Sequence, residues 1–446
     1  MTVAGTVLAA VLIPGLAGAG WKAPRNISPA GEPARSPALA VAPNGAMVLA
    51  WHRFDGTQPP STCCDRIQAV VRRPNGKLGK VRTLSAPGQD ARFARAAIGS
   101  DGTAAVIWRR LDGSDPPGCC ARAQVRVFRP GGGWGEVQTL SEAGESVNDW
   151  DVAVGRDGRA IAMWTREDPG FFRRLQVRIR PPGIGPKPRF GNFEVLSPPG
   201  ESAYSPHLGM APSGAAAIVW QRFDGTHDRT VAKVRRPKGD FGGRKNLSRP
   251  DDEADYHTVA VGPDGTTVAA WLVETPGLEY ELEVRRRVPG GRFGPIVKLS
   301  GGANSGEPEV GIDSERRTTV AWEQLVSPEP RIAARTARRG TNFGARKFLS
   351  PAGDSAQNPL VAVSADGSTI VGWRHFDDSG PSCCGLAQAR VRAPGKRRFG
   401  GQRRLSDVGA GAGNMVVAIA NRLRAFSAWD RSDGSDLRVQ LAAHKR

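Results

Sequence analysis

Short apolar runs alternate with turn-forming residues along most of this chain. In the first such unit, runs at 38–43, 46–54, 66–74 and 80–85 are rich in Val and Ala, and Asn-Gly turns or a longer loop separate them. Runs of this length and composition, punctuated by Gly, Pro, Asn and Asp, are typical of β-strands. The pattern predicts four strands, A to D in chain order, with tight A–B and C–D turns.

The unit recurs along the whole chain, and two residue types mark it. A tryptophan late in each strand B returns every 51 to 57 residues, at Trp51, Trp108, Trp164, Trp220, Trp271, Trp322, Trp373 and Trp429. A serine precedes each tryptophan by 22 or 23 residues, at Ser28, Ser85, Ser141, Ser197, Ser248, Ser300, Ser350 and Ser406. Four-stranded repeats of about 50–57 residues describe the blades of a β-propeller. The sequence therefore predicts an all-β fold, a single propeller of eight four-stranded blades.

The two ends of the chain predict how the ring closes. The last repeat has runs for strands A, B and C but none for strand D. Residues 20–28, GWKAPRNIS, match the strand D segment GWGEVQTLS at 133–141. We therefore expect the N-terminal strand to complete the last blade, which leaves no open sheet edge. The chain then divides into residues 1–19 and one propeller domain, residues 20–446.

The first 19 residues have the features of a secretory signal peptide. An apolar run ends in Ala17-Gly18-Ala19, a small-residue cleavage pattern, although no Lys or Arg precedes the run. An uncleaved N-terminal anchor is the alternative, but the run is short for a membrane span. No other apolar run of that length follows. We expect an exported protein, secreted or held at the cell surface, in a compartment where disulfides persist.

The recurrent tryptophans have two interpretations. A large apolar side chain at the same place in every blade is expected to pack between neighbouring blades and to stabilise the ring. The alternative is that the indole rings form an aromatic platform for sugars. The two interpretations differ in the exposure that they require of the side chain.

Strand direction decides which loops share a face of the propeller. Because successive strands run in opposite directions, the B–C loops and D–A segments lie on one face, and the A–B and C–D turns on the other. D–A segments such as 248–258 are long, and the B–C loops are longest in blades 1, 2 and 7. Since loops on a rigid scaffold carry most binding sites, we predict the B–C/D–A face as the binding face.

All the cysteines occur as adjacent pairs in those three long B–C loops. The pairs are Cys63 and Cys64, Cys119 and Cys120, and Cys383 and Cys384. Blade 8 separates blades 7 and 1 and has no cysteine, so the pair in blade 7 has no near partner. We expect three disulfides, each between neighbouring residues, that stiffen the loop tips. Cross-linking of blades 1 and 2 is the alternative, whereas metal-binding pairs are usually spaced C-x2-C.

Charged residues follow the tryptophan in six blades and share its face of strand B. They are Arg53, Asp55, Arg110, Asp112, Arg166, Asp168, Arg222, Asp224, His375, Asp377, Arg431 and Asp433. Five blades match W-x-R-x-D, and blade 7 has His in place of Arg. One interpretation is an inter-blade network of Arg and Asp that repeats because the blade repeats. The other is a charged rim of the central channel that holds a polar or acidic ligand on the binding face.

Three D–A segments, in the consecutive blades 3, 4 and 5, are the least repetitive. They contain Asp149, Tyr204, His207, Asp255, Tyr256 and His257. A carboxylate near tyrosine and histidine can transfer protons. The catalytic candidates are therefore Asp149, Tyr204, Asp255, Tyr256 and His257. The alternative is a loop hydrogen-bond cluster without a catalytic role. The sequence shows no metal-ligand constellation, nucleotide-binding loop or nucleophile elbow, and we expect no metal and no cofactor.

The net charge of +19 changes the expected partners only in part. Arginines are spread through the repeats at alternating strand positions, without a dense basic run or tail. Nonspecific binding to polyanions, such as acidic polysaccharide or an anionic cell wall, is expected from this charge. An exported protein rarely meets nucleic acid, and few aromatic residues lie among the arginines, so we predict no nucleic-acid partner.

The Asp-Gly turn that precedes the tryptophan in several repeats resembles the Asp-box of the sialidase-like β-propellers. In GPDGTTVAAW and GSDGTAAVIW, Asp and Gly are adjacent and Trp lies farther on than in the family pattern S-x-D-x-G-x-x-W. The resemblance covers the whole chain from residue 20 and implies a propeller fold. It carries over no catalytic residues, because the family's arginine triad, Tyr–Glu pair and acid/base Asp have no assignable counterpart; PRNIS at 24–28 is a faint echo of its early arginine motif.

Three functions follow from this reading. The first is an exported, non-catalytic binding module for a glycan, a cell-wall polymer or a protein, with its site on the B–C/D–A face. The second is a glycan-active hydrolase or lyase with acid and base residues in blades 3 to 5. The third is a purely structural surface protein. The strong periodicity favours the first, because catalysis usually breaks a repeat at one place.

Overall fold

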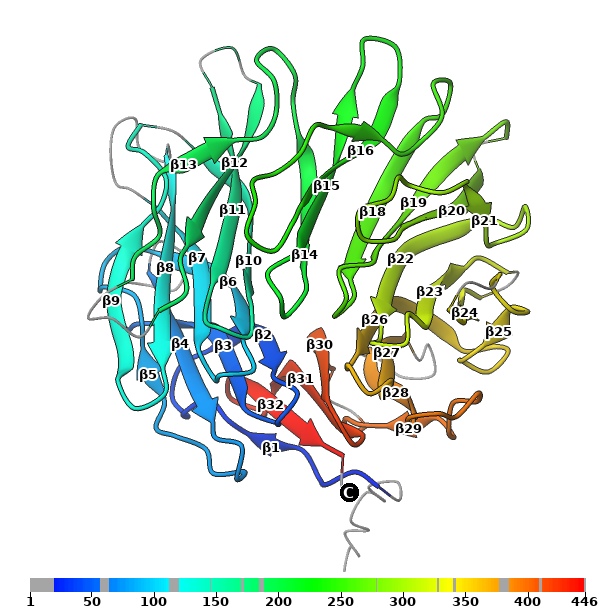
Figure 1. Ribbon diagram of the computed structural model, residues 1–446. Coiled ribbons are helices and arrows are strands. Elements are labelled where there is room, and N and C mark those ends of the chain that lie inside the picture. Colours follow the sequence, from blue (N-terminus) through cyan, green and yellow to red (C-terminus); the bar gives the residue numbers. More distant parts are fainter. Residues whose placement is uncertain are drawn as a thin grey trace, which may run out of the picture.

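The structure is a computed structural model that describes residues 20–56, 64–111, 120–144, 146–168, 170, 172–183, 188–277, 279–326, 329–339, 342–376, 385–408 and 411–444. Within these residues the chain forms eight four-stranded antiparallel sheets, arranged as blades around a central axis (Figure 1). No helix occurs in the same ranges. The predicted all-β, eight-bladed propeller is confirmed.

Each blade contributes its strand A to the inside of the ring and its strand D to the rim (Figure 1). The A strands are β2 (Ala34–Val41), β6 (Ala91–Ile98), β10 (Val147–Val154), β14 (Tyr204–Met210), β18 (Ala254–Val261), β22 (Ser305–Ile312), β26 (Ser355–Val363) and β30 (Gly413–Ala420). The B strands are β3 (Met47–Phe54), β7 (Ala104–Leu111), β11 (Ala160–Glu167), β15 (Ala216–Phe223), β19 (Thr267–Thr275), β23 (Thr318–Gln324), β27 (Thr369–Phe376) and β31 (Arg424–Ser432).

The outer half of each blade consists of one long and one short strand. The C strands are β4 (Asp65–Arg72), β8 (Ala121–Arg129), β12 (Arg173–Arg180), β16 (Asp228–Arg235), β20 (Glu279–Arg287), β24 (Arg331–Ala337), β28 (Leu386–Arg392) and β32 (Leu437–Ala443). The D strands are β5 (Arg82–Thr83), β9 (Gly133–Thr139), β13 (Phe193–Val195), β17 (Lys245–Asn246), β21 (Val297–Lys298), β25 (Lys347–Phe348), β29 (Arg403–Arg404) and β1 (Arg25–Asn26). Most D strands are shorter than the sequence predicts, since seven of the eight span two or three residues.

The N-terminal strand closes the ring as expected. Strand β1 pairs with β32, with Arg25 opposite Leu441 and Asn26 opposite Gln440. Trp21 is buried, at 3% exposure, and forms a further bridge to His444. The last blade is therefore built from both ends of the chain, and its C strand is not left as an open edge.

The recurrent tryptophans form the packing between blades. All eight indole side chains are fully buried, at 0% exposure. Trp108, for example, packs against Val48 and Leu84 of the preceding blade. Its indole N–H donates to the Gln124 side chain at 3.2 Å, so burial does not leave this polar atom unpaired. The packing interpretation is confirmed, and complete burial excludes these tryptophans as a sugar platform.

The recurrent serines hold the outer strands together. In each blade the serine hydroxyl at the end of strand D accepts a hydrogen bond from a backbone N–H of strand C. The donors are Ile67, Ala123, Leu175, Thr230, Leu282, Ile332, Ala387 and Val439. The serines are buried, so this bond satisfies a strand N–H that water does not reach. The nearly constant spacing of serine and tryptophan thus reflects two fixed contacts of the blade.

Candidate functional site

The B–C loops and D–A segments share one face of the propeller. The end of strand B is joined to the end of the D–A segment by a backbone hydrogen bond in several blades. Examples run from Phe54 N–H to Pro33 O at 3.1 Å and from Glu274 N–H to Glu253 O at 2.9 Å. The three longest B–C loops lie largely outside the described residues, at 57–63, 112–119 and 377–384. Within the described residues, the candidate site on this face consists of residues of the innermost strands.

Every strand A contains an irregularity where it enters the sheet from this face. The register with strand B shifts in all eight blades. At this shift, fifteen residues before the tryptophan, lies a position that we call the mouth ring. Its members are Ser36, Phe93, Asp149, Ser205, Tyr256, Glu307, Asn358 and Asn414. Bulges of this kind redirect side chains and are frequent beside binding sites.

Two members of the mouth ring are unusual for their backbone conformation. Six of the eight positions have positive φ, and four of those six carry Ser or Asn. The other two are Phe93, with φ of 53°, and Tyr256, with φ of 47°. Bulky residues are disfavoured there, and neither gains compensating burial, since Phe93 is 46% and Tyr256 51% exposed. Exposed aromatic rings held in a strained conformation indicate a functional position.

A second ring lies two residues further along strand A, and we call it the axial ring. Its members are Ala38, Arg95, Asp151, His207, Thr258, Glu309, Leu360 and Val416. Each pairs with the residue before the tryptophan, so the eight positions are equivalent. Blades 2 to 6 place polar side chains here, whereas blades 7, 8 and 1 place apolar ones. The ring is therefore polar on one side of the axis and apolar on the other.

The polar side of the axial ring contains groups with altered proton affinity. Burial raises the pKa of Asp151 to about 6, against the opposing effect of Arg95 and of hydrogen bonds from the Val152 and Leu208 backbone. Burial also lowers the pKa of His207, and Arg95 lowers it further, so this imidazole is neutral near pH 7. Arg95 itself is exposed and makes no hydrogen bond or ion pair to any other described residue. A ligand over the axis thus meets a guanidinium, a titratable carboxyl and a neutral imidazole.

The stability of the protein should depend on pH through another carboxyl of the axial ring, that of Glu309. Burial raises the pKa of Glu309 to about 7, with a smaller contribution from Glu307. The stability from this group is present below the unfolded-state pKa and is lost as the pH rises through 7. Glu309→Gln should therefore stabilise the protein more at pH 8 than at pH 5. We expect about 1–2 kcal/mol at pH 8 after allowing for the carboxyl's partial exposure.

Urea unfolding at the two pH values checks this expectation. Glu142→Gln is the matched control, because Glu142 is exposed on a D–A segment. An equal effect of Glu309→Gln at both pH values would contradict the assignment of the raised pKa to Glu309.

The structure brings together part of the cluster predicted in blades 3 to 5. The rings of His207 and His257 meet edge to face, with centroids 5.6 Å apart. His257 Nε2 lies 2.6 Å from the Ser205 carbonyl oxygen of the preceding blade. Asp149 partly opposes the lowering of the His207 pKa that burial causes, and it accepts a hydrogen bond from the Thr165 hydroxyl at 2.9 Å. Asp149, His207 and His257 therefore form one group at the axis.

The tyrosines and Asp255 of that cluster lie apart from this group. The Arg173 guanidinium stacks over the Tyr204 ring at 5.2 Å, which draws Tyr204 toward strand C of blade 3. Tyr256 contacts Tyr280 of its own blade, with ring centroids 6.3 Å apart. Asp255 accepts a hydrogen bond from the Tyr256 N–H at 2.7 Å. No single acid–base constellation of all five catalytic candidates forms among the described residues.

The charged residues after the tryptophans mostly contact other parts of the loops. Arg222 pairs with Glu201 through two hydrogen bonds of 2.5 and 2.9 Å, and Arg431 pairs with Asp407 at 2.8 Å. Arg53 donates to the Ala30 carbonyl at 3.2 Å. His375 lies 3.9 Å from the Asp354 carboxylate. These contacts link strand B to the D–A segment of the same face.

The aspartates of the same motif close the B–C turns. Asp224 accepts backbone N–H bonds from Thr226 and His227 and pairs with Arg229 at 2.8 Å. These backbone bonds lower the pKa of Asp224 to about 2, so it stays ionised. Asp433 makes the equivalent contacts to its own turn and to Arg438.

The remaining members of the motif have fewer contacts that can be described. Asp168 lies 3.7 Å from the Arg174 guanidinium. Asp55, Arg110 and Arg166 are also engaged in contacts. Asp112 and Asp377 lie outside the described residues. The contacts that are described lie within one blade and its own loops. The inter-blade network and the ligand rim both stay predictions.

The cysteine pairs are described only in part. Cys64 and Cys120 are both buried, at 3% exposure. Cys63, Cys119, Cys383 and Cys384 lie outside the described residues, as does the predicted signal peptide at 1–19. The disulfide connectivity and the export of the protein stay predictions. Cys120 has φ of 72°, which marks a sharp change of chain direction at the start of strand β8.

Neither a metal-binding cluster nor a membrane-spanning helix occurs among the described residues. No group of three or more His, Cys, Asp or Glu side chains is placed to hold a metal ion within those residues. No helix there has the length and apolar character that crossing a membrane requires.

Sequence reasoning found Asp149 and Tyr256 but missed other aromatic and charged members of the two rings. Phe93, Arg95, Asp151 and Glu309 were not among its candidates. A signal was present, because each lies thirteen or fifteen residues before a tryptophan and departs from the small or apolar residue found in other blades. The position of the bulge, which makes these residues face the axis, is visible only in the structure.

Comparison with known proteins places the fold. No protein-family model matches the chain, and no curated protein matches its sequence. The BP39L lectin from Burkholderia pseudomallei aligns with a TM-score of 0.50 and 14% identity, over 84% of this chain and 100% of the lectin. A protein of unknown function from Dyadobacter fermentans aligns with a TM-score of 0.40 and 14% identity, over 95% of this chain and 99% of that one.

A sialidase from Trypanosoma rangeli also aligns, with a TM-score of 0.39 and 10% identity, over 83% of this chain and 57% of the sialidase. Identities this low show the arrangement of strands and no shared activity. The chain is an eight-bladed β-propeller, and its likeness to these solved structures is one of fold alone.

Proposed function

We propose that this chain is an exported glycan-binding propeller whose ligand lies over the ring axis on the B–C/D–A face. The observation that carries the proposal is the strained, exposed pair Phe93 and Tyr256, beside an axial ring that is polar in blades 2 to 6. Apolar faces of sugar rings stack on aromatic side chains, and sugar hydroxyls bond to carboxylates and guanidinium groups. Exposed aromatics with a few placed polar groups are the usual composition of a binding site.

The lectin neighbour is consistent with this proposal at the level of the fold. The BP39L protein is named a lectin and aligns over its whole length with this chain. Its identity of 14% carries no residue-level argument. A fold leaves function open, so the proposal rests on the two rings and not on the neighbour.

The second candidate is a glycan-active hydrolase or lyase that uses the same site. One observation favours it: Asp151, with its pKa raised to about 6, lies one blade from the neutral imidazole of His207. A carboxyl that titrates near neutral pH is suited to general acid–base catalysis. The absence of a single acid–base constellation among the described candidates favours binding without turnover.

A glycan and cell-wall polysaccharide array tests the proposal. The chain from residue 20, oxidised, is applied at about 0.15 M and about 1 M salt, because high salt screens nonspecific attraction to its charge. Binding that persists at high salt supports a specific glycan site. Signal that vanishes with salt, or no signal, overturns it and favours a protein-binding or structural role. Release of shorter products from the bound glycan would favour the enzyme.

A further inference from the structure

A basic cavity lies on the opposite face of the ring, between blades 6 and 7. Its volume is about 240 Å³, and the ends of the C strands and the C–D turns form its wall. Six basic residues line it: Arg317, Arg338, Lys347, Arg392, Lys396 and Arg397. No carboxylate is among the described residues that line it. The even spread of arginine expected from the sequence does not hold at this place.

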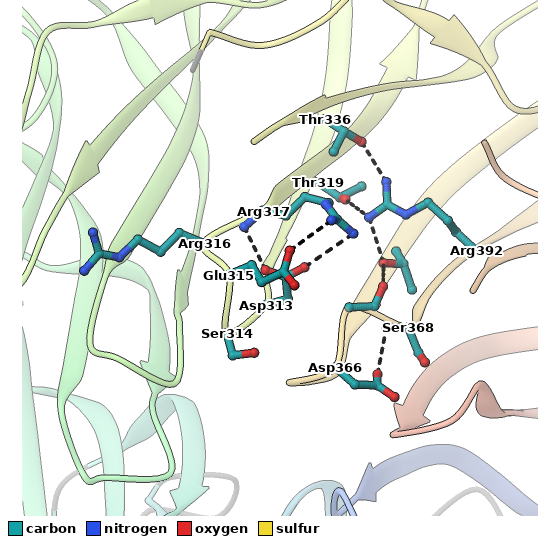
Figure 2. A network of polar contacts seen from close by, with 12 residues as sticks. Asp313, Ser314, Glu315, Arg316, Arg317, Thr319, Thr336, Asp366, Ser368 and Arg392 are labelled. Carbon is teal, nitrogen blue, oxygen red and sulfur yellow. Dashed lines mark hydrogen bonds and ion pairs between the residues drawn. The ribbon is translucent and has the colours of Figure 1, made fainter. Parts of the chain in front are cut away.

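Arg392 is the buried centre of this cavity. Its side chain, at 1% exposure, donates to three threonine hydroxyls, those of Thr319, Thr336 and Thr369, at 2.9 to 3.0 Å (Figure 2). Its Nε has no hydrogen-bond partner, and no ion pair to a carboxylate occurs within the described part of the chain. Burial lowers the pKa of Arg392 to about 10, and the nearby Arg317 lowers it further. Hydroxyl oxygens carry no formal charge, so these three bonds do not neutralise the guanidinium. Its other described contacts are the Phe399 ring, with the centroid 5.0 Å away, and the electrostatic attraction of Asp313.

Two acidic side chains lie near this site and form ion pairs with Arg317. Arg317 lies beside Arg392, and its guanidinium reaches Glu315 at 3.2 Å and Asp313 at 3.9 Å (Figure 2). These two carboxylates offset the charge of Arg317, and Asp313 also attracts the Arg392 guanidinium. Lys396 and Arg397, in the C–D turn of blade 7, are exposed at the cavity entrance. The excess of positive charge therefore remains with Arg392 and the turn.

An arginine at the place of Arg392 belongs to the blade repeat, but its contacts to threonine hydroxyls do not. Arg72, Arg180, Arg235 and Arg287 hold the equivalent place in four other blades. In blade 4 the residue equivalent to Arg392 is Arg235, which donates to the Gly214 carbonyl of its own A–B turn at 2.9 Å. In blade 6 the equivalent is Ala337. The matching cavity between blades 5 and 6, of about 120 Å³, has Arg286 as its one basic lining residue. The cavity between blades 1 and 2 is lined by four basic residues, Arg73, Lys80, Arg82 and Arg126. The six basic residues at the site between blades 6 and 7 exceed both of these counts.

We propose that this cavity binds an oxyanion group of a ligand, such as a carboxylate, a sulfate or a phosphate. Arg392 and the turn residues Lys396 and Arg397 would donate to its oxygens. Guanidinium and ammonium groups bind oxyanions through short, charge-assisted hydrogen bonds. The cavity is on the A–B/C–D face, so this site is separate from the glycan site proposed above and does not rest on it.

Calorimetric titration at low ionic strength tests the proposal, with sodium sulfate, sodium phosphate and sodium acetate as separate probes. We expect saturable binding of at least one anion by the parent protein, and the strongest probe identifies the oxyanion. The double variant Lys396→Gln and Arg397→Gln should weaken that binding about tenfold. Both residues are exposed, so the variant should fold normally.

The matched control is the double variant Arg236→Gln and Lys238→Gln, in the equivalent C–D turn of blade 4. It removes the same net charge from an exposed turn that lies outside this cavity. Its binding should stay at the parental level. Equal weakening in both double variants would show a nonspecific charge effect and overturn the proposal. Absence of anion binding by the parent protein, or unchanged binding by the blade 7 variant, would overturn it as well.

A further variant separates this site from the glycan site. Phe93→Ala with Tyr256→Ala should leave anion binding unchanged, since both residues lie on the other face. Loss of anion binding in that variant would overturn the assignment to the cavity.

Discussion

Deleting residues 20–28 should destabilise the propeller by roughly 5 kcal/mol or more, because a buried Trp and several buried hydrogen bonds are lost together. Trp21 is buried in the last blade, and the Ser28 hydroxyl accepts the Val439 N–H at 3.0 Å. The deletion also turns β32 into an open edge, which invites association of chains. We expect a lower thermal midpoint, a less cooperative transition and a tendency to self-associate.

Differential scanning calorimetry and light scattering check this result. The control is a chain that starts at residue 20 and so keeps the closing strand. A synthetic peptide of residues 20–28, added to the deleted chain, should raise the midpoint again, since it can restore the pairing of β1 with β32. An unchanged midpoint and a monomeric deleted chain would contradict the role of the N-terminal strand in closing the ring.

Replacing both Phe93 and Tyr256 with Ala should weaken glycan binding by about 100-fold, since exposed aromatics of this kind act as binding hot spots. The aromatic side chains of Phe93 and Tyr256 are the large apolar surfaces of the mouth ring. Folding stability should stay within about 0.5 kcal/mol of the parent, because neither side chain contributes to the core. A loss of affinity without a loss of stability separates a binding role from a structural one.

Phe223→Ala is the matched control for this variant. Phe223 is 52% exposed and ends strand β15 on the same face, so it offers an aromatic ring outside the innermost strands. Its replacement should leave the affinity unchanged. Equal losses in Phe223→Ala and in the double variant, or no loss in either, would contradict a site at the axis. Titration of an array-selected glycan at about 1 M salt keeps charge effects out of the comparison.

The fold was predictable because each blade repeats the same contacts. Trp108 and Ser141 occupy places that recur in every blade, one between the sheets and one between strands C and D. Apolar periodicity and turn residues therefore gave the strand count, and the match of 20–28 to 133–141 gave the closure. Strand D was overestimated in length, since the run predicted at 80–85 contains the two-residue strand β5, Arg82–Thr83.

The candidate site was predictable only in part, for a physical reason. Asp149, Tyr256 and His257 stood out because they break the repeat in residue type. Arg95 and Asp151 do so as well, but their importance depends on the bulge that turns strand A toward the axis. A bulge is set by backbone conformation and register, which residue type alone does not fix. Arg222 and Asp224 show the opposite case. Their motif suggested a rim that holds a ligand, but Arg222 pairs with Glu201 and Asp224 pairs with Arg229.

Hydrogen–deuterium exchange with and without an array-selected glycan tests the central claim most directly, because it locates the ligand without any substitution. The account predicts protection in the N-terminal halves of β6, β10, β14 and β18, which carry Phe93, Asp149, Ser205 and Tyr256. The A–B turns and the C–D turn of blade 7 should be unaffected. Protection confined to the rim strands or to the A–B/C–D face would contradict a glycan site at the ring axis.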